Sequence, residues 1–242
     1  MTSYGSLINE NSITGNGYVT QIVSAGEMKN TGTIATKNVA IINSLGNLNN
    51  GGIISNTPQM SVTAAGNLSN AGTIHATNLL SVTTNGNLNT TYNSSLNSSN
   101  QLTVTALGNI DNGGIQGHGA TMNINNTVTS NSGHIKGDTL SLNTYLDMVN
   151  TGTLETKGDL TINTQNNGKL TNEGTIKAGN TLTLSAKQVV NAKSYKCGFL
   201  NLKTCTNNGT LTANKRILNS SHKYASNMGG NQNFKATEIN TK

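Results

Sequence analysis

The side chains with the most reactive chemistry in this sequence are two cysteines near its C-terminal end. Cys197 and Cys205 lie in the segment YKCGFLNLKTC, residues 195–205. Two thiols this close together could form a disulfide or contribute ligands to a metal ion. A metal site would need histidine or further cysteine nearby, and the segment contains neither. The sequence therefore predicts no metal site around these cysteines.

Acid–base catalysis finds little support in the distribution of titratable groups. The acids are scattered, and Arg216 is the only arginine. The histidines share no metal-ligand spacing, because they lie far apart in the sequence, at His75, His118, His134 and His222. We therefore expect no enzymatic activity, no cofactor and no resident metal.

Positive charge is concentrated in the last quarter of the chain. Residues 187–242 contain nine lysines and arginines and one acid, a net charge of +8, whereas residues 1–186 carry −2. Such a basic segment could bind an anionic surface, for example lipopolysaccharide or a sulfated glycan, or it could simply be the solvated end of a filament. Nucleic acid is not an expected partner, because the segment has no recognition motif and no regularly placed aromatic residues.

Composition argues against a thick-cored domain of the kind that positions an active site. Of the 242 residues, 33% are hydrophobic, 10% charged and 3% aromatic, with 27 glycines and a single proline. An average globular chain has roughly 45–50% apolar and 25% charged residues. Disorder is also disfavoured, because proline and glutamate are scarce. About 40 asparagines and evenly spread aliphatic residues are typical of a repeat protein with a thin core.

Two short motifs recur along the chain at a nearly constant interval. Clear copies of Gly-Asn-Leu/Ile begin at Gly46, Gly66, Gly86 and Gly108. The other motif is Asn-x-Gly, which keeps nearly the same spacing, with copies beginning at Asn30, Asn50, Asn70, Asn112, Asn131, Asn150, Asn172 and Asn207. Together the motifs predict about ten repeat units, more than the three that a repeat array needs for stability.

Each repeat contains short alternating segments that read as strands. MSVT (60–63), LSVT (80–83) and LTIN (160–163) alternate aliphatic and polar residues, as half-buried strands do. Glycine and asparagine are expected at the corners, because they tolerate left-handed backbone. Short strands separated by such corners coil, so that successive turns pair in parallel about 4.8 Å apart. We therefore predict an all-β, right-handed parallel β-helix of about ten coils, roughly 50 Å long.

Alignment of the repeats places charged residues of opposite sign next to one another. Lys136, Glu155 and Lys177 fall in one column on adjacent turns, and Asp138 lies beside Lys157 in another. Opposite charges paired across a ladder stabilise it by about 0.2–1 kcal/mol. In the turn that contains GIQ (114–116) the aliphatic residue comes one position early, so we expect a bulge or a shifted corner there.

The segments GNLNNGGI, AGNLSNAGTIHATNLLSVTTNGNL and VNTGTLETKGDLTINT resemble the haemagglutinin repeats of filamentous haemagglutinin-like exoproteins. That family comprises two-partner-secreted adhesins and contact-dependent growth inhibition effectors of Gram-negative bacteria. The resemblance covers residues 20–190 and implies a β-helical filament that an outer-membrane transporter exports to the cell surface. We expect an internal fragment of a longer protein, because no signal peptide opens the sequence. No apolar run approaches the roughly 20 residues of a membrane span.

The resemblance implies that the chain is exported, and export favours a disulfide between the two cysteines. In an exported chain they most simply form a Cys197–Cys205 disulfide, worth about 2–3 kcal/mol for so short a loop. They lie in an insertion, residues 193–206, that splits one repeat and should project from the β-helix edge. The loop either presents a binding surface or merely decorates one turn. Candidate partner contacts in and near it are Tyr195, Lys196, Phe199, Leu200, Lys203, Arg216 and Lys223.

The repeat region is expected to cover residues 1–218. Past Leu218 the alternation fades and turn-forming residues dominate. We therefore expect residues 219–242 to form an irregular basic segment. This segment either caps the open end of the β-helix or begins another region.

These observations favour a structural and adhesive filament segment that contacts a host or target-cell surface molecule, either a protein receptor or an anionic glycan or lipopolysaccharide. The second interpretation is a receptor-recognition segment of a growth-inhibition effector, binding through the loop around Cys197 and Cys205. A polysaccharide-active enzyme would need clustered carboxylates, and the repeat alignment brings no two carboxylates together on adjacent turns, because the stacked charges are opposite in sign. An ice-binding surface would need a regular threonine ladder. The hydroxyl columns Ser61/Thr63, Ser81/Thr83, Thr103/Thr105 and Thr181/Thr183 are interrupted at Asn123/Asn125.

Overall fold

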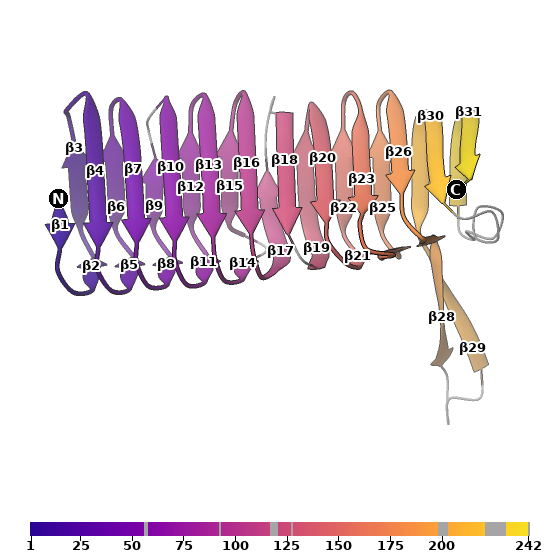
Figure 1. The fold of residues 1–242 in the computed structure, drawn as a ribbon, viewed down its shortest axis with the longest axis horizontal. Coiled ribbons are helices and arrows are strands. Elements are labelled where there is room, and N and C mark those ends of the chain that lie inside the picture. Colours follow the sequence, from indigo (N-terminus) through magenta and orange to yellow (C-terminus); the bar gives the residue numbers. More distant parts are fainter. Residues whose placement is uncertain are drawn as a thin grey trace.

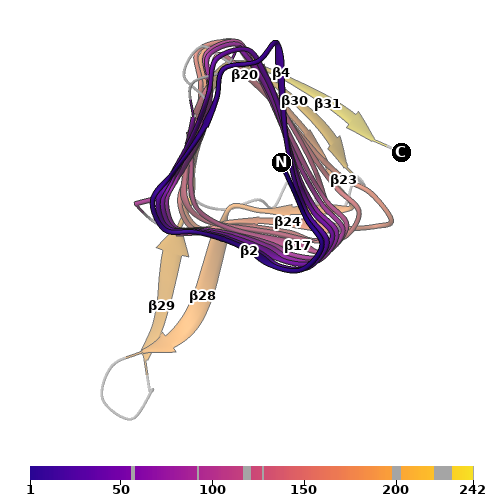
Figure 2. The same cartoon turned by 90° about the vertical axis from the view of Figure 1, so that its left-hand side faces the viewer.

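The computed structural model is an elongated solenoid of three-sided turns stacked along one axis (Figure 1), and the view along that axis shows the three sides (Figure 2). It describes residues 1–55, 58–91, 93–116, 121–126, 128–197, 203–220 and 231–241, with side-chain contacts for those within 1–112, 130–191 and 209–213. The regular part amounts to about eight turns of about 20 residues, against about ten expected. The predicted all-β parallel solenoid is confirmed.

The longest strands form one side, here called the long-strand side. Strands on neighbouring turns pair in parallel one repeat apart, so that Leu80 lies beside Leu102 and Met122 beside Leu140. After the two-residue β1 (Thr2–Ser3), this side contains β4 (Val19–Ser24), β7 (Val39–Ser44), β10 (Gln59–Ala64), β13 (Leu79–Thr84), β16 (Gln101–Ala106), β18 (Thr121–Asn126), β20 (Thr139–Thr144), β23 (Leu160–Thr164) and β26 (Thr181–Ser185). The later residues of β30 (Thr210–Ser220) extend it, while the first residues of β30 pair with β25 (Thr175–Ala178) on another side, and β31 (Asn231–Thr241) pairs along β30.

Shorter strands form the other two sides. The second side contains β2 (Leu7–Asn9), β5 (Met28–Asn30), β8 (Leu48–Asn50), β11 (Leu68–Asn70), β14 (Leu88–Thr90), β17 (Asn109–Gln116), β19 (Val128–Gly137), β21 (Met148–Asn150), β24 (Lys169–Asn172) and β27 (Gln188–Val190). The third contains β3 (Ser12–Gly15), β6 (Thr33–Thr36), β9 (Ile53–Ser55), β12 (Thr73–Ala76), β15 (Ser95–Ser98), β22 (Thr153–Thr156) and β25 (Thr175–Ala178). Strands β17 and β19 run through the corner between these two sides. Their register shifts between Asn112 and Gly114, which confirms the irregularity predicted for this turn.

The core is a set of aliphatic columns that run along the axis. Inward positions of the long strands stack Ile22 on Ile42 and then on Val62, and the second side stacks Leu48 on Leu68. All of these side chains are at most 1% exposed. Each turn therefore buries only a few aliphatic side chains, which is why a chain with 33% hydrophobic residues can fold this way.

A column of asparagines shares this interior. Asn9, Asn30, Asn50, Asn70, Asn112, Asn131, Asn150, Asn172 and Asn191 are all at most 6% exposed, with Thr90 taking the place of asparagine in one turn. Where asparagines follow one another on neighbouring turns, the amide nitrogen of one donates to the amide oxygen of the next, as from Asn30 to Asn50 at 2.7 Å and from Asn50 to Asn70 at 2.8 Å. Thr90 donates instead through its hydroxyl, to Asn112 Oδ1 at 2.6 Å. The second proton of Asn50 Nδ2 reaches backbone carbonyls of Gly52 and Thr73. We call this column the asparagine ladder.

The repeat asparagines and glycines of the corners do not adopt the left-handed backbone that the sequence led us to expect. Among the described non-glycine residues, only Asn166 and Asn167 have positive φ, so the repeat asparagines do not serve as left-handed corners. They turn inward and satisfy backbone groups instead. Gly52 is likewise outside the left-handed region, and a Cβ on it would collide with the carbonyl oxygen of Gly32 in the preceding turn. Glycine is required there for close approach between turns.

The outward hydroxyl columns stack as expected over several turns. Ser61 lies beside Ser81, and Ser81 beside Thr103, before Asn123 interrupts the column. The pair expected at the C-terminal end of these columns, Thr181/Thr183, was wrong by two residues. Thr183 continues the column of Ser61 and Ser81, and Ser185 continues the neighbouring column.

The C-terminal segment contains more regular structure than the fading repeat suggested. Residues 231–241, within the segment expected to be irregular, form β31 in parallel register with β30. Arg216 is paired with Leu182, so it occupies a register position that aliphatic residues fill in earlier turns.

The first prediction tests the asparagine ladder with two adjacent residues. Asn50→Ala should lower the free energy of unfolding by about 3 kcal/mol, because it removes the buried hydrogen bonds that Asn50 makes with Asn30, Asn70 and Thr73. Asn49→Ala removes only an exposed hydrogen bond to Glu27 and should change stability by less than about 0.5 kcal/mol. Urea unfolding followed by circular dichroism compares them, and equal destabilisation would contradict the ladder's role.

The second prediction uses two adjacent glycines. Gly52→Ala should destabilise by about 2 kcal/mol, because the Gly32 carbonyl that it meets is held by the Ile53 amide at 2.9 Å. Gly51→Ala has its nearest neighbour, the Asn30 oxygen, at 3.9 Å and should be neutral or stabilising by about 0.4–1 kcal/mol. Thermal unfolding of the two variants measures the difference; a stable Gly52→Ala protein would show that the turns are not in contact there.

Candidate functional site

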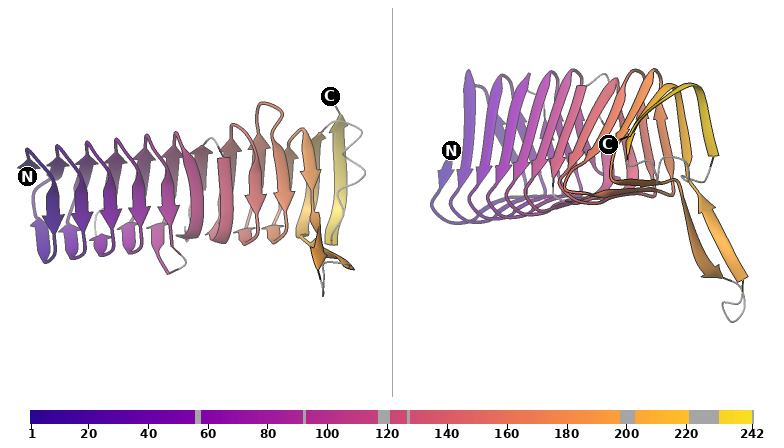
Figure 3. Two further views of the ribbon diagram at one scale, coloured as in Figure 1. Left: turned by 90° about the horizontal axis from the view of Figure 1, so that it is seen from below. Right: turned by 45° about the vertical axis from the view of Figure 1, so that its right-hand side comes forward.

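The insertion forms a two-stranded antiparallel hairpin that projects from the solenoid (Figure 3). Strand β28 (Ala192–Cys197) leaves the body after β27, and β29 (Lys203–Asn208) returns to β30. The hairpin leaves from the corner between the second and third sides, opposite the long-strand side (Figure 2). The projecting loop expected at this place is therefore a hairpin with a defined register.

Two hydrogen bonds close the base of the hairpin. The Gly209 amide donates to the Asn191 carbonyl oxygen at 2.9 Å, and Asn191 Nδ2 donates to the Gly209 carbonyl oxygen at 2.9 Å. Asn191 also accepts from Asn172 Nδ2 at 2.7 Å, so the asparagine ladder runs up to the insertion. Beyond it the Thr210 amide donates to Gly174 at 2.8 Å, just as Thr175 donates to Gly152 one turn earlier. The solenoid thus continues as if the insertion were absent.

Alternation along the hairpin sorts its residues onto two faces. The paired positions of one face are Lys193 with Asn207, Tyr195 with Cys205 and Cys197 with Lys203; those of the other are Ser194 with Thr206 and Lys196 with Thr204. Both cysteines, the tyrosine and two of the three lysines therefore share one face of the ribbon, which we call the cysteine face.

The register bears on the predicted disulfide. Cys197 and Cys205 are diagonal neighbours on the cysteine face, two residues out of direct opposition. Diagonal residues are about 7–8 Å apart, whereas disulfide-linked Cα atoms are usually about 4.4–6.8 Å apart. A two-residue slip of β29 would bring the cysteines opposite each other and keep every residue on its present face. The disulfide stays a prediction.

The other candidate contacts divide between the hairpin and the C-terminal turns. Tyr195, Lys196 and Lys203 lie in the hairpin strands, and Arg216 lies in β30 on the long-strand side. Phe199, Leu200 and Lys223 lie outside the described residues. The structure therefore brings three of these positions together and places Arg216 on a different part of the solenoid.

The charged columns on the third side form ion pairs as expected. Glu155 lies between Lys136, at 3.2 Å, and Lys177, at 2.8 Å, and Asp138 pairs with Lys157 at 2.9 Å. Hydrogen bonds from Lys177 and then Lys136 lower the pKa of Glu155 below its ordinary value of 4.5. These groups remain partly exposed, so each pair contributes only about 0.2–1 kcal/mol. They stabilise the stacking of three turns and offer no unpaired carboxylate for catalysis.

Carboxylates elsewhere also join one turn to the next. Asp147 accepts the backbone amide of Lys169 at 2.8 Å, and Asp159 accepts that of Thr181 at 3.0 Å. The Asn47 side chain likewise accepts the backbone amide of Asn67 at 2.8 Å, so the exposed Gly-Asn-Leu motif is a second link between turns.

The sequence analysis missed the inward role of the Asn-x-Gly asparagines. Their regular spacing was visible, but it fits a corner residue and a ladder residue equally well.

Within the described residues, no group of three or more histidine, cysteine, aspartate or glutamate side chains is placed to hold a metal ion. No helix in that part of the chain is long and apolar enough to cross a membrane.

Comparison with protein families gives one result. The model of the haemagglutinin repeat matches residues 2–52, 33–91, 80–145 and 137–221, which together cover most of the chain. Haemagglutinin repeats occur in secreted bacterial exoproteins, where they are typically non-catalytic adhesin repeats. Comparison with curated proteins and with solved structures finds no match.

The ion pairs around Glu155 predict a small pH dependence of stability. Because the folded pKa is lowered, the stabilisation is complete above the unfolded value of about 4.5 and is lost as the pH falls through the folded value. Between pH 6 and pH 3 the free energy of unfolding of the wild type should fall by about 1 kcal/mol more than that of the Glu155→Gln variant. Urea unfolding at each pH measures both values. Glu10→Gln in the first turn is the control and should follow the wild type. If the stability of Glu155→Gln has the same pH dependence as that of the wild type, the ion pairs contribute nothing to stability.

Proposed function

The chain belongs to the haemagglutinin-repeat family, and from that premise we propose that it is a rigid, non-catalytic, adhesive segment of a filamentous exoprotein. The right-handed rod is exported through an outer-membrane transporter and displayed on the surface of a Gram-negative bacterium. There it contacts a host or target-cell surface molecule, either a protein receptor or an anionic glycan or lipopolysaccharide.

The observation that carries this proposal is the repeated linkage from one turn to the next. Backbone ladders on three sides, the asparagine ladder inside and the Asn47-type links outside all join neighbouring turns. Bending the rod would have to break several of these bonds at once. A long, stiff body with few titratable groups suits reach and display. Among the described residues, no group of three or more histidine, cysteine, aspartate or glutamate side chains lies together.

A second candidate function gives the hairpin the decisive role. In this version the segment recognises a receptor for a contact-dependent growth inhibition effector, through the hairpin. The supporting observation is that the hairpin is closed at its base by the Asn191–Gly209 bonds and projects away from the body. Its cysteine face gathers Lys193, Tyr195 and Lys203, a tyrosine and two cations suited to an anionic or hydroxyl-rich partner.

The experiment that separates the two candidates replaces residues 192–208 with a single threonine. The corner then reads Asn191-Thr-Gly209, like the natural Asn150-Thr151-Gly152 corner, so the solenoid should remain folded. Purified wild-type and hairpin-less proteins are compared by flow cytometry on candidate target cells. If the rod itself is adhesive, both bind; if the hairpin recognises a receptor, only the wild type binds. Binding by neither would contradict both.

The disulfide between Cys197 and Cys205 is part of the proposal. Peptide mapping without reduction, after exposure to oxidised glutathione, should find the two cysteine peptides linked. The oxidised protein should also have a higher melting temperature than the Cys197→Ser/Cys205→Ser variant, because a closed loop of this size contributes about 2–3 kcal/mol. Two unlinked glutathione adducts would show that the register observed in the hairpin keeps the cysteines apart.

A further inference from the structure

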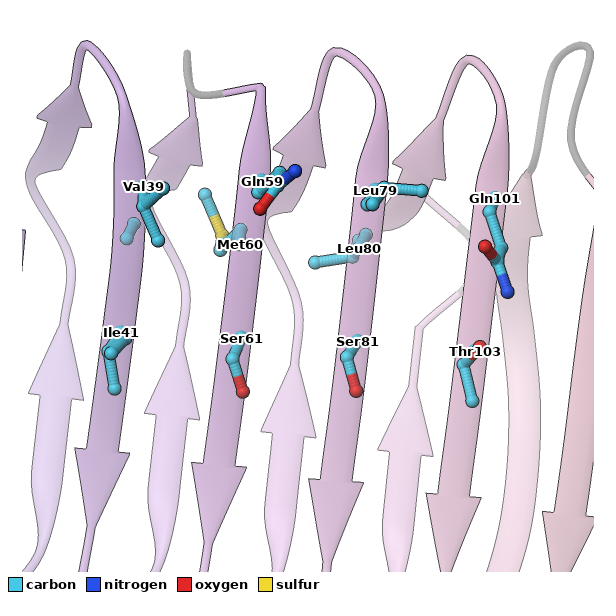
Figure 4. Close-up of a pocket in the computed structure, with 11 residues that line it drawn as sticks. Val39, Ile41, Gln59, Met60, Ser61, Leu79, Leu80, Ser81, Gln101 and Thr103 are labelled. Carbon is cyan, nitrogen blue, oxygen red and sulfur yellow. The ribbon is translucent and has the colours of Figure 1, made fainter. Parts of the chain in front are cut away.

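A shallow pocket of about 300 Å³ lies on the long-strand side, away from the hairpin. It crosses β7, β10, β13 and β16 and is open to solvent. Figure 4 shows the outward side chains in two rows that run across the strands, whereas Met60 and Leu80 belong to the buried core. We call this feature the axial groove, because its rows run parallel to the solenoid axis.

The two rows have distinct chemistry. One alternates apolar and amide side chains, Val39, Gln59, Leu79 and Gln101, and the other continues from Ile41 into the hydroxyls Ser61, Ser81 and Thr103. Val39 and Leu79 are half-buried and Ile41 is 37% exposed, so apolar surface is available between the polar groups. None of the lining residues is charged.

The spacing within each row is set by the fold. Neighbours in a row come from hydrogen-bonded parallel strands, so they are about 4.8 Å apart, and like residues such as Val39 and Leu79 recur at about twice that distance. A ligand that makes the same contact repeatedly must advance by a matching distance per unit. The groove therefore selects for the repeat length of a polymer.

An extended peptide does not meet this condition. It advances by about 3.3–3.4 Å per residue, so its side chains fall out of step with the rows within two turns. An anionic polymer finds no cation among the lining residues. An uncharged β-1,4-linked pyranose chain meets both conditions, because its rings advance by about 5 Å, close to the strand spacing of about 4.8 Å, and alternate in orientation. Its rings also combine an apolar face with a rim of hydroxyls.

We propose that the axial groove binds an uncharged, extended β-linked glycan that lies along the solenoid axis. Val39 and Leu79 contact the apolar faces of alternate rings. The amides of Gln59 and Gln101 and the hydroxyls of Ser61, Ser81 and Thr103 bond to the ring hydroxyls, since amides and hydroxyls both donate and accept. This site is independent of the hairpin and of the role proposed for it.

The test is calorimetric titration of the full chain with cellohexaose and with chitohexaose. Maltohexaose, which is α-linked and coils out of step with the rows, is the control ligand. We expect binding of at least one β-linked hexamer, at least tenfold tighter than its disaccharide, and no binding of maltohexaose. Failure of both β-linked hexamers, or equal binding of maltohexaose, would overturn the proposal.

Paired variants locate the site. Val39→Ser/Leu79→Ser should weaken binding about tenfold, because it removes the apolar contacts and leaves the buried core unchanged. Ile8→Ser/Ile53→Ser is the matched control, since these aliphatic residues are 64% and 46% exposed on the other two sides. Circular dichroism verifies the fold of both. Equal affinity of the two variants would place the glycan elsewhere. The hairpin-less protein should bind like the wild type, so this test does not depend on the proposed function.

Discussion

The whole structure depends on one constraint: each turn must bond to a near-copy of itself about 4.8 Å away. An inward side chain therefore meets its own equivalent on the next turn, and only some residue types can satisfy that contact. Aliphatic residues pack on themselves. Among polar residues the amide of asparagine both donates and accepts, so a column such as Asn30, Asn50 and Asn70 satisfies itself inside the core. The same logic requires glycine where one turn's Cβ would meet the backbone of the previous one, as at Gly52.

Much of this could be predicted from the sequence, because stacking converts a periodic sequence into spatial neighbours. Once the repeat length was known, the ion pairs of Glu155, the irregular register near Gly114 and the projecting insertion followed directly. The buried direction of Asn50 did not follow, because asparagine also favours corners and spacing cannot distinguish the two. The axial groove was missed for another reason. The groove consists of two neighbouring rows of side chains, one with Val39 and Gln59 and the other with Ile41 and Ser61. A comparison of the repeats one column at a time does not reveal a surface that two columns form together.

Rod and appendage have separate structural requirements. The hairpin enters and leaves at a corner where the Asn191–Gly209 bonds and the Thr210–Gly174 bond keep the ladders in register. Residues 192–208 can therefore vary without disturbing the core. The axial groove, in contrast, is built from outward positions of the strands themselves, so its row spacing is fixed by the backbone. One scaffold thus offers an adaptable site at a corner and a periodic site on a flat side.

The central claim is that the asparagine ladder is buried and hydrogen-bonded along the axis. Hydrogen exchange of asparagine side-chain amides, followed by NMR, tests it most directly. The Nδ2 protons of Asn30, Asn50 and Asn150 should exchange orders of magnitude more slowly than those of the exposed Asn47 and Asn67, because opening them requires separating turns. Equally fast exchange of both sets would contradict the account.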